Sequence, residues 1–169
     1  LIDEEGFIPI SNVQDILAMD STDTHTFGAG TKYEVVTSGG LTNNYLLLND
    51  IDLIGNVFTS SAVEGMYSGS FRGRDYTISN LTIDTTLDYA GFFAQLSSSA
   101  MVTNLNLSNV NIQTTARFAG GLAGFSSRPS ELSNISVSGM IYSSSTYVGG
   151  IVGSSQAFGE QISEQLRFT

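Results

Sequence analysis

Two glycine-rich segments are the first features of this sequence that could do chemistry. Residues 119–125 read AGGLAGF and residues 147–153 read YVGGIVG. A dinucleotide-binding turn needs G-x-G-x-x-G between a strand and a helix, and a phosphate loop needs a Lys-Ser/Thr pair. The spacing here differs and strand-like sequence follows, so we predict structural glycines and no cofactor. The glycines concerned are Gly91, Gly120, Gly121, Gly124, Gly149, Gly150 and Gly153.

Carboxylates are the second candidates. The first repeat places Asp75, Asp84 and Asp88 near Arg72 and Arg74. Cleavage of a polysaccharide needs two or three carboxylates on one face, but the later repeats carry only Glu131. Asp50 and Asp52 alternate outward in a strand-like run that lacks the ligand density of a calcium loop. A solvated surface is the favoured interpretation of all these acids.

His25 is the only histidine, and the chain has no cysteine. A zinc site needs several such ligands, and a serine nucleophile would need a Gly-x-Ser-x-Gly turn that the sequence lacks. We therefore predict no catalytic residues and no metal ligands, and hence a protein that is not an enzyme.

The overall charge limits the partners. The chain has 169 residues and a net charge of −10, and Lys32 is its only lysine. A nucleic-acid binder needs a basic surface, and no apolar run approaches the roughly 18 residues of a membrane span. We predict no nucleic-acid partner and no membrane insertion. Because the sequence starts at Leu1, we expect a processed product or a fragment.

The strongest signal is an internal repeat. The segments ISNLTI (78–83), VTNLNL (102–107) and LSNISV (132–137) align on Asn80, Asn104 and Asn134, which are 24 and 30 residues apart. A second motif recurs between them, aligned on Gly91, Gly120 and Gly149 with spacings of 29 and 29. Two motifs that alternate three times predict a repeat architecture.

The units fit stacked β-strands better than helices or leucine-rich repeats, because short alternating runs are joined by breaks in the alternation. Each Asn lies at such a break, so we predict corners at which Asn80, Asn104 and Asn134 form one hydrogen-bonded ladder. Glycosylation of Asn80, Asn106 and Asn134 is the alternative. The residues predicted to point inward are Ile78, Leu81, Ile83, Val102, Leu105, Leu107, Leu132, Ile135 and Val137.

These motifs together resemble the GLUG repeats of bacterial surface proteins. The resemblance covers roughly residues 45–155 and includes YLLLNDIDLIGNVF (45–58) as the start of the repeats. It implies an all-β, right-handed parallel β-helix on secreted or surface-anchored proteins, often adhesins. Such repeats also lie beside the catalytic region of some immunoglobulin A peptidases. That activity is not carried over, because the zinc-binding His-Glu-x-x-His is absent.

The ends of the chain predict a cap and a terminal unit. Residues 10–20 predict a short helix capped by Ser11 or Asn12, with Val13, Ile16 and Leu17 as its apolar stripe, and 20–32 predict a loop. Ile162 begins like a fourth unit, but Glu164, Gln165 and Arg167 interrupt the pattern. We expect an N-terminal cap with the strands that lead into the helix (1–44), about four coils of β-helix (45–155), and a terminal coil or cap (156–169).

The expected function is structural and adhesive: an extracellular or cell-surface module that displays or spaces a binding surface. The partner would be a surface glycan, a protein receptor or further copies of the chain. A self-assembling fibre subunit is the alternative, and a polysaccharide-active enzyme is a third. Outward hydroxyl and amide rows could bind a glycan: Thr77, Ser79, Thr82, Thr103, Asn106, Ser133 and Ser136. Tyrosines could supply stacking platforms: Tyr67, Tyr76, Tyr89, Tyr142 and Tyr147.

Overall fold

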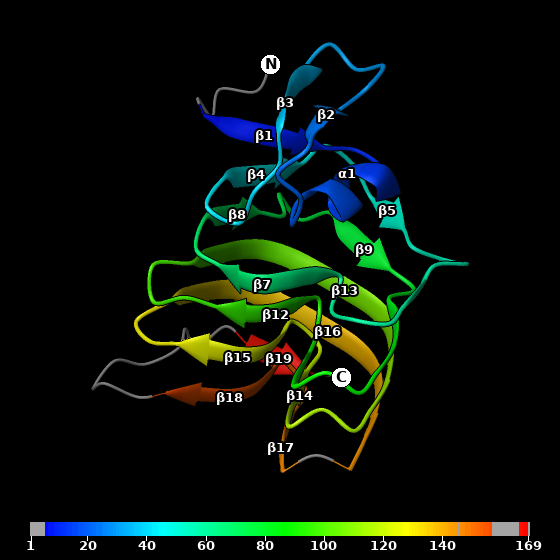
Figure 1. Cartoon of the computed structure of the whole chain (residues 1–169), viewed down its shortest axis with the longest axis vertical. Helices are drawn as coiled ribbons and strands as arrows, with labels where there is room; N and C mark the ends of the chain where they lie inside the picture. Colours follow the sequence, from blue (N-terminus) through cyan, green and yellow to red (C-terminus); the bar gives the residue numbers. More distant parts are fainter. Residues whose placement is uncertain (1–5, 145, 157–165, 169) are drawn as a thin grey trace.

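The chain folds as a parallel β-solenoid of about four turns, as the sequence predicts. We analysed a computed structural model, which describes residues 6–144, 146–156 and 166–168. The coils are stacked along the long axis of the molecule, with the N-terminal cap at one end and the last coil at the other (Figure 1). Every described strand pair between coils is parallel.

The coils contribute strands to a shared set of faces. The first coil holds β4 (Asn44–Leu47), β5 (Ile51–Asp52), β6 (Val57–Phe58) and β7 (Val63–Tyr67). The second holds β8 (Ser70–Arg72), β9 (Thr77–Ser79), β10 (Thr82–Thr85), β11 (Tyr89–Ala90) and β12 (Phe93–Leu96). The third holds β13 (Met101–Thr114), β14 (Phe118–Gly120) and β15 (Ala123–Ser127). The fourth holds β16 (Glu131–Ser143), β17 (Tyr147–Gly149) and β18 (Val152–Gln156).

The long strands β13 and β16 each run over three faces. The start of β13 pairs with β8, its middle with β9 and its end with β10. We call these the first, second and third faces. The fourth face holds β11, β14 and β17, and the fifth holds β7, β12, β15 and β18.

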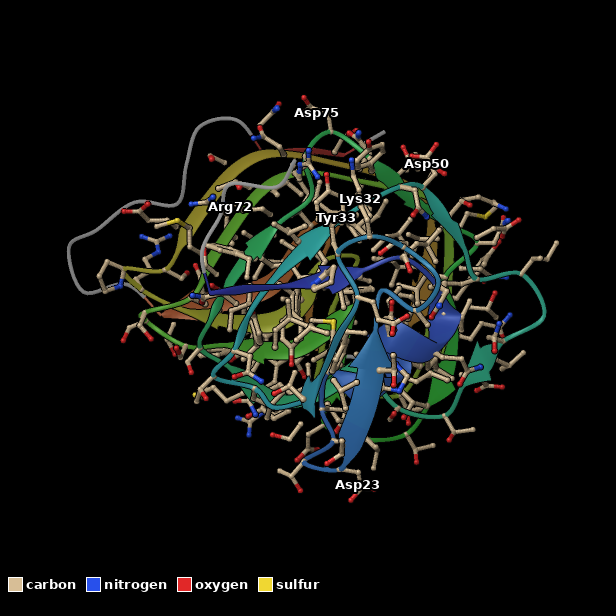
Figure 2. All side chains as sticks on the ribbon, turned by 90° about the horizontal axis from the view of Figure 1, so that it is seen from above. Asp23, Lys32, Tyr33, Asp50, Arg72 and Asp75 are labelled. Atoms are coloured by element: carbon tan, nitrogen blue, oxygen red, sulfur yellow. The ribbon has the colours of Figure 1, made fainter. Side chains whose placement is uncertain are left out.

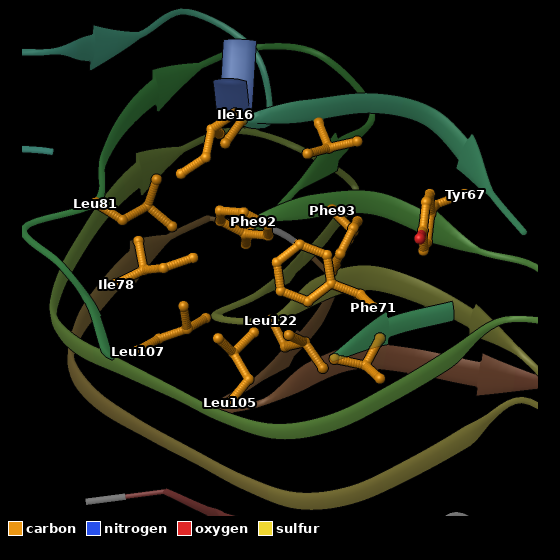
Figure 3. Packing of buried hydrophobic residues seen from close by; sticks show 14 of the residues in the cluster. Ile16, Tyr67, Phe71, Ile78, Leu81, Phe92, Phe93, Leu105, Leu107 and Leu122 are labelled. Atoms are coloured by element: carbon orange, nitrogen blue, oxygen red, sulfur yellow. The ribbon is translucent and has the colours of Figure 1, made fainter. Parts of the chain in front are cut away.

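Aliphatic rows fill the interior. In-register pairing places Ile51, Ile78, Leu107 and Val137 in one row along the second face. Figure 3 shows Ile78, Leu107, Phe92 and Leu122 meeting in the core. All nine residues predicted to point inward are buried, with at most 1% of their surface exposed. Leu122 and Ile151, between the glycines, are buried as well.

The N-terminal cap covers the first coil. Strand β1 (Phe7–Ile10) pairs with β4, and the helix α1 (Val13–Ala18) follows with Asn12 as its N-cap. This confirms the predicted helix, in which Ile16 is buried. Leu17 is instead 40% exposed, and Met19 takes its place in the core. The prediction of a loop over 20–32 is wrong in part, because β2 (Thr24–Phe27) pairs with β3 (Val35–Ser38) as an antiparallel hairpin.

The predicted interruption of the repeat at Arg167 is also wrong. Strand β19 (Leu166–Phe168) pairs with β16, with Arg167 opposite Ser136 and Phe168 opposite Val137. The spacing at this step is 31 residues rather than 30, so Arg167 pairs with Ser136 and not with Val137, as a spacing of 30 would require. The interruptions predicted at Glu164 and Gln165 lie outside the described residues.

Candidate interaction surface

The corner asparagines form two ladders rather than the single predicted one. Asn134 Nδ2 donates to Asn104 Oδ1 at 2.7 Å, whereas Asn80 Oδ1 accepts from Nδ2 of Asn109, also at 2.7 Å. Asn80 therefore does not stack on Asn104. It lies one corner further along the coil, because ISNLTI (78–83) pairs with LSNVNI (107–112). Both ladders have a spacing of 29 or 30 residues, and the discordant spacing of 24 came from aligning different corners.

In the upper coils, carboxylates hydrogen-bond to the asparagine ladders without taking the asparagine positions, since Asp52 pairs with Ser79. Asp52 Oδ1 accepts from Nδ2 of Asn80 at 2.7 Å and extends that ladder into the first coil. These hydrogen bonds, from Asn80 first and from the Ile54 N–H second, hold the pKa of Asp52 below its usual value. Asp75 lies beside the other ladder, where its N–H donates to the Asn104 carbonyl at 2.8 Å. Asp50 Oδ1 accepts from the Thr77 N–H at 2.8 Å. Through these hydrogen bonds the three acids join successive coils.

The glycines lie where neighbouring backbones touch. A Cβ on Gly120 would come within 2.3 Å of the Ala123 carbonyl oxygen and 2.5 Å of the Gly153 nitrogen. Gly120 pairs with Gly149, and the Gly121 N–H donates to the Gly150 carbonyl of the next coil. A Cβ on Gly91 would lie 2.7 Å from the Gly120 carbonyl oxygen. A Cβ on Gly153 would lie 2.6 Å from the Gly124 carbonyl oxygen. These contacts leave no room for a phosphate.

The carboxylates proposed for polysaccharide chemistry are spread over different faces. Asp75 lies at the first corner, Asp84 pairs outward with Gln113 on the third face, and Asp88 lies between the third and fourth faces. Figure 2 also places Asp23 on the opposite side of the molecule from Asp50 and Asp75. Within the described residues, no group of three His, Asp or Glu side chains is placed to hold a metal ion.

His25 belongs to the cap. Its Nε2 lies 2.8 Å from Oδ1 of Asp15, which is fully buried. The other carboxylate oxygen of Asp15 accepts from the N–H groups of Ser11 and Gly28, at 2.9 and 3.1 Å. The pair joins the start of α1 to the hairpin, which sequence reasoning missed because the two residues are far from any repeat.

The tyrosines predicted to stack on a sugar differ in exposure: Tyr142 and Tyr147 of the last coil are 55% and 42% exposed. Tyr67 is fully buried, and its hydroxyl donates to the Asn43 carbonyl. Tyr89, Phe118 and Tyr147 stack face to face along the fourth face, with centroids 5.2 and 5.0 Å apart and interplanar angles of 8° and 13°. Within this column the ring faces meet one another, so a sugar that binds to an aromatic face is not accommodated between them.

A polar surface extends along the second face of coils two to four and, across the corner, along the first face of coils three and four. On the first face, Arg72 of coil two precedes Thr103 in the row. Asn106 pairs with Thr77 and Ser136, Thr103 pairs with Ser133, and Ser108 pairs with Ser79. All of these side chains are partly exposed. We call the seven residues the polar face: Thr77, Ser79, Thr103, Asn106, Ser108, Ser133 and Ser136. The predicted row member Thr82 lies on the third face, paired with Val57 and Asn111.

Comparison of the chain with protein-family models, curated proteins and solved structures finds no significant match. Over the described residues, no helix has the length and apolar character needed to cross a membrane.

Proposed function

We propose that this chain is a non-enzymatic, extracellular or cell-surface module that displays the polar face to a surface glycan. One observation supports this most directly: the row Thr77, Asn106 and Ser136 is uncharged and stays in register over three coils. The pairs Ser79–Ser108 and Thr103–Ser133 extend it over two coils each. Adjacent strands are spaced by about 4.8 Å, so the rows present hydroxyl and amide groups at regular intervals. Such groups can both donate and accept hydrogen bonds, as sugar hydroxyls require. The GLUG-like motifs are consistent with this role.

A glycan array with the purified chain tests the proposal. We expect binding to at least one glycan class, and loss of that binding in Asn106→Arg, which places a bulky charge at the centre of the polar face. Gln113→Arg is the matched control, because Gln113 is an exposed side chain of the same strand on the third face. Silence on the array would exclude glycan adhesion and leave spacing as the role. An equal loss of glycan binding in Gln113→Arg would show that the binding site is not on the polar face.

A further inference from the structure

The second face is a narrow surface that ends at a corner on each side. In coils two, three and four it lies between residues with a positive φ: Asp75 and Asn80, Asn104 and Asn109, and Asn134 and Gly139. Successive side chains of a strand point to opposite sides of the sheet. The outward side chains of this face in coil three are therefore Asn106 and Ser108, on either side of the buried Leu107. A ligand that runs across the coils reaches a corner after these two positions.

Along the solenoid axis the second face continues without a corner. Two rows of outward side chains follow the axis and together form what we call the axial strip: Asp50, Thr77, Asn106 and Ser136 in one row, and Asp52, Ser79 and Ser108 in the other. Adjacent coils lie about 4.8 Å apart, so the strip is about 14 Å long over coils one to four. A ligand that contacts all four coils must therefore be elongated and must follow the axis.

Carboxylates lie at the coil-one end of the axial strip and along one side of it. Asp50 and Asp52 are exposed, and Figure 2 places Asp75 on the same side of the molecule as Asp50. Asp75 is exposed at the corner, where its carbonyl accepts from Nδ2 of Asn106 at 3.1 Å. Carboxylates accept hydrogen bonds from hydroxyl groups and repel other anions. These positions favour a ligand that brings hydroxyl groups and no negative charge.

The arginines that border the axial strip in register have other partners or lie at its end. The Arg72 guanidinium lies over the Phe7 ring of the cap, 4.2 Å from the ring centroid, and Arg74 Nη1 donates to a backbone carbonyl of coil one at 3.4 Å. Arg167 pairs with Ser136 in the strand that follows the last residue of the strip. A uronic-acid polymer carries a carboxylate on every unit, and the strip side chains of coils two to four are uncharged. Most carboxylates of such a polymer would therefore lie along the strip without a cation.

From the corners, the in-register rows and the surrounding charges, we infer that the glycan bound by the polar face is an uncharged, extended chain that lies along the solenoid axis. A pyranose unit is comparable in length to the coil spacing, so successive units meet successive coils of the axial strip. One end of the chain reaches Asp50 and Asp52, whose carboxylates accept hydrogen bonds from its hydroxyl groups. The inference rests on the proposed function and adds the class of glycan and the direction in which it lies.

Calorimetric titration of the full chain with oligosaccharides of increasing length tests this inference. The probes are unbranched gluco-, manno- and xylo-oligosaccharides, with oligogalacturonate as the carboxylated counterpart. In at least one neutral series, the tetrasaccharide should bind at least about tenfold more tightly than the disaccharide, because it gains hydrogen bonds to two further coils. The hexasaccharide should bind about as tightly as the tetrasaccharide, because the strip spans four coils. Oligogalacturonate of the same length should bind more weakly than the neutral chain.

Alanine variants in two coils test the direction of the chain. Thr77 and Ser136 belong to one row but lie in coils two and four, about 10 Å apart. Thr77→Ala and Ser136→Ala should each weaken tetrasaccharide binding about threefold or more, since each removes a hydrogen-bonding hydroxyl group. Gln113→Ala is the matched control, because Gln113 is exposed on the third face, and its affinity should equal that of the unchanged chain.

The outcomes separate this inference from the proposed function. Equal affinity for short and long chains, tighter binding of oligogalacturonate, or weakening by only one of the two strip variants would overturn the inference and leave glycan binding intact. Equal weakening by Gln113→Ala would also overturn it, because the chain would then not follow the strip. If no neutral series binds, the inference is wrong, and the glycan array decides the proposed function separately.

Discussion

Four asparagines adopt the left-handed backbone conformation that most residues avoid. Asn80, Asn104, Asn109 and Asn134 have φ between 52° and 61°. Asparagine enters this region at lower cost than other residues with a Cβ, and its amide can donate and accept at once. Each of these side chains therefore permits the corner and also bonds to the next coil. The corner is fixed by one residue type for two separate reasons.

Asn104→Leu should separate these contributions when it is compared with Asn104→Gly. Leucine loses the bond to Asn134 and must also hold a φ of 53°, so we expect a loss of about 1–3 kcal/mol in unfolding free energy. Glycine loses only the bond and should cost less. Asn111→Leu is the control, because Asn111 is exposed in the same strand without a positive φ. If Asn104→Leu melts like the control, the ladder contributes nothing to stability.

The Asp52–Asn80 bond should give stability a dependence on pH. Hydrogen bonding lowers the pKa of the Asp52 carboxyl in the folded state. Its contribution is therefore present above the unfolded pKa and is lost as the pH falls through the folded pKa. Asp52→Asn should melt below the unchanged protein at neutral pH, and the difference should shrink in strong acid. Asp84→Asn, at an exposed carboxylate on the third face, is the control for the loss of one negative charge. A pH-independent difference for Asp52→Asn would contradict the prediction.

The sequence identified the corner residue type correctly but not its register. The spacing of 24 between Asn80 and Asn104 already disagreed with the glycine spacing of 29. Asn109, within LSNVNI (107–112), was the missing partner. The error arose because both corners of a coil carry the same pattern of aliphatic, polar and Asn residues. The local pattern alone cannot show which corner a motif occupies. The coil length of 29 or 30 residues can, because it relates each corner to the same corner of the next coil.

At the level of elements, close backbone contact between coils determines where glycine is required. Strands β14 and β17 approach β15 and β18 so closely that Gly120 and Gly153 leave no space for a methyl group. The sequence located these elements because the glycines recur at constant spacing. It did not locate the β2–β3 hairpin, which occurs once, or the register of β19, which follows a longer connection. Repetition made the coils predictable, and its absence left the ends uncertain.

Two glycine substitutions should differ in cost according to these distances. In Gly120→Ala the new methyl carbon would meet backbone atoms at 2.3 and 2.5 Å, whereas in Gly124→Ala the nearest backbone atoms are at 3.0 Å. Because backbone cannot rotate away, we expect Gly120→Ala to lose about 3 kcal/mol or more and Gly124→Ala to lose less. Denaturant unfolding measures the loss of unfolding free energy in each variant. A larger loss for Gly124→Ala than for Gly120→Ala would show that the backbone around Gly120 relaxes freely.

Over the whole molecule, stability should vary along the solenoid axis, since each coil contacts only its neighbours. The cap depends on local bonds, above all on Asp15, whose carboxylate accepts from Ser11, Gly28 and His25. It also covers the top of the core, where Ile16 and Met19 are fully buried and Ile51 is 4% exposed. Loss of the Asp15 acceptor should therefore open the cap before the coils unfold.

Asp15→Ala tests this arrangement by hydrogen exchange. The variant leaves the Ser11 and Gly28 N–H groups without their acceptor, at a cost of about 2–4 kcal/mol. Amides of residues 7–38 should exchange at least about 30-fold faster, while those of β13 and β16 keep their rates, because they lie two coils or more away. Asp15→Asn retains one acceptor oxygen, so the exchange rates of its cap amides should lie between those of the unchanged chain and those of Asp15→Ala. Uniform acceleration along the chain would mean that cap and coils unfold as one cooperative unit, and that the nearest-neighbour description of this solenoid is wrong.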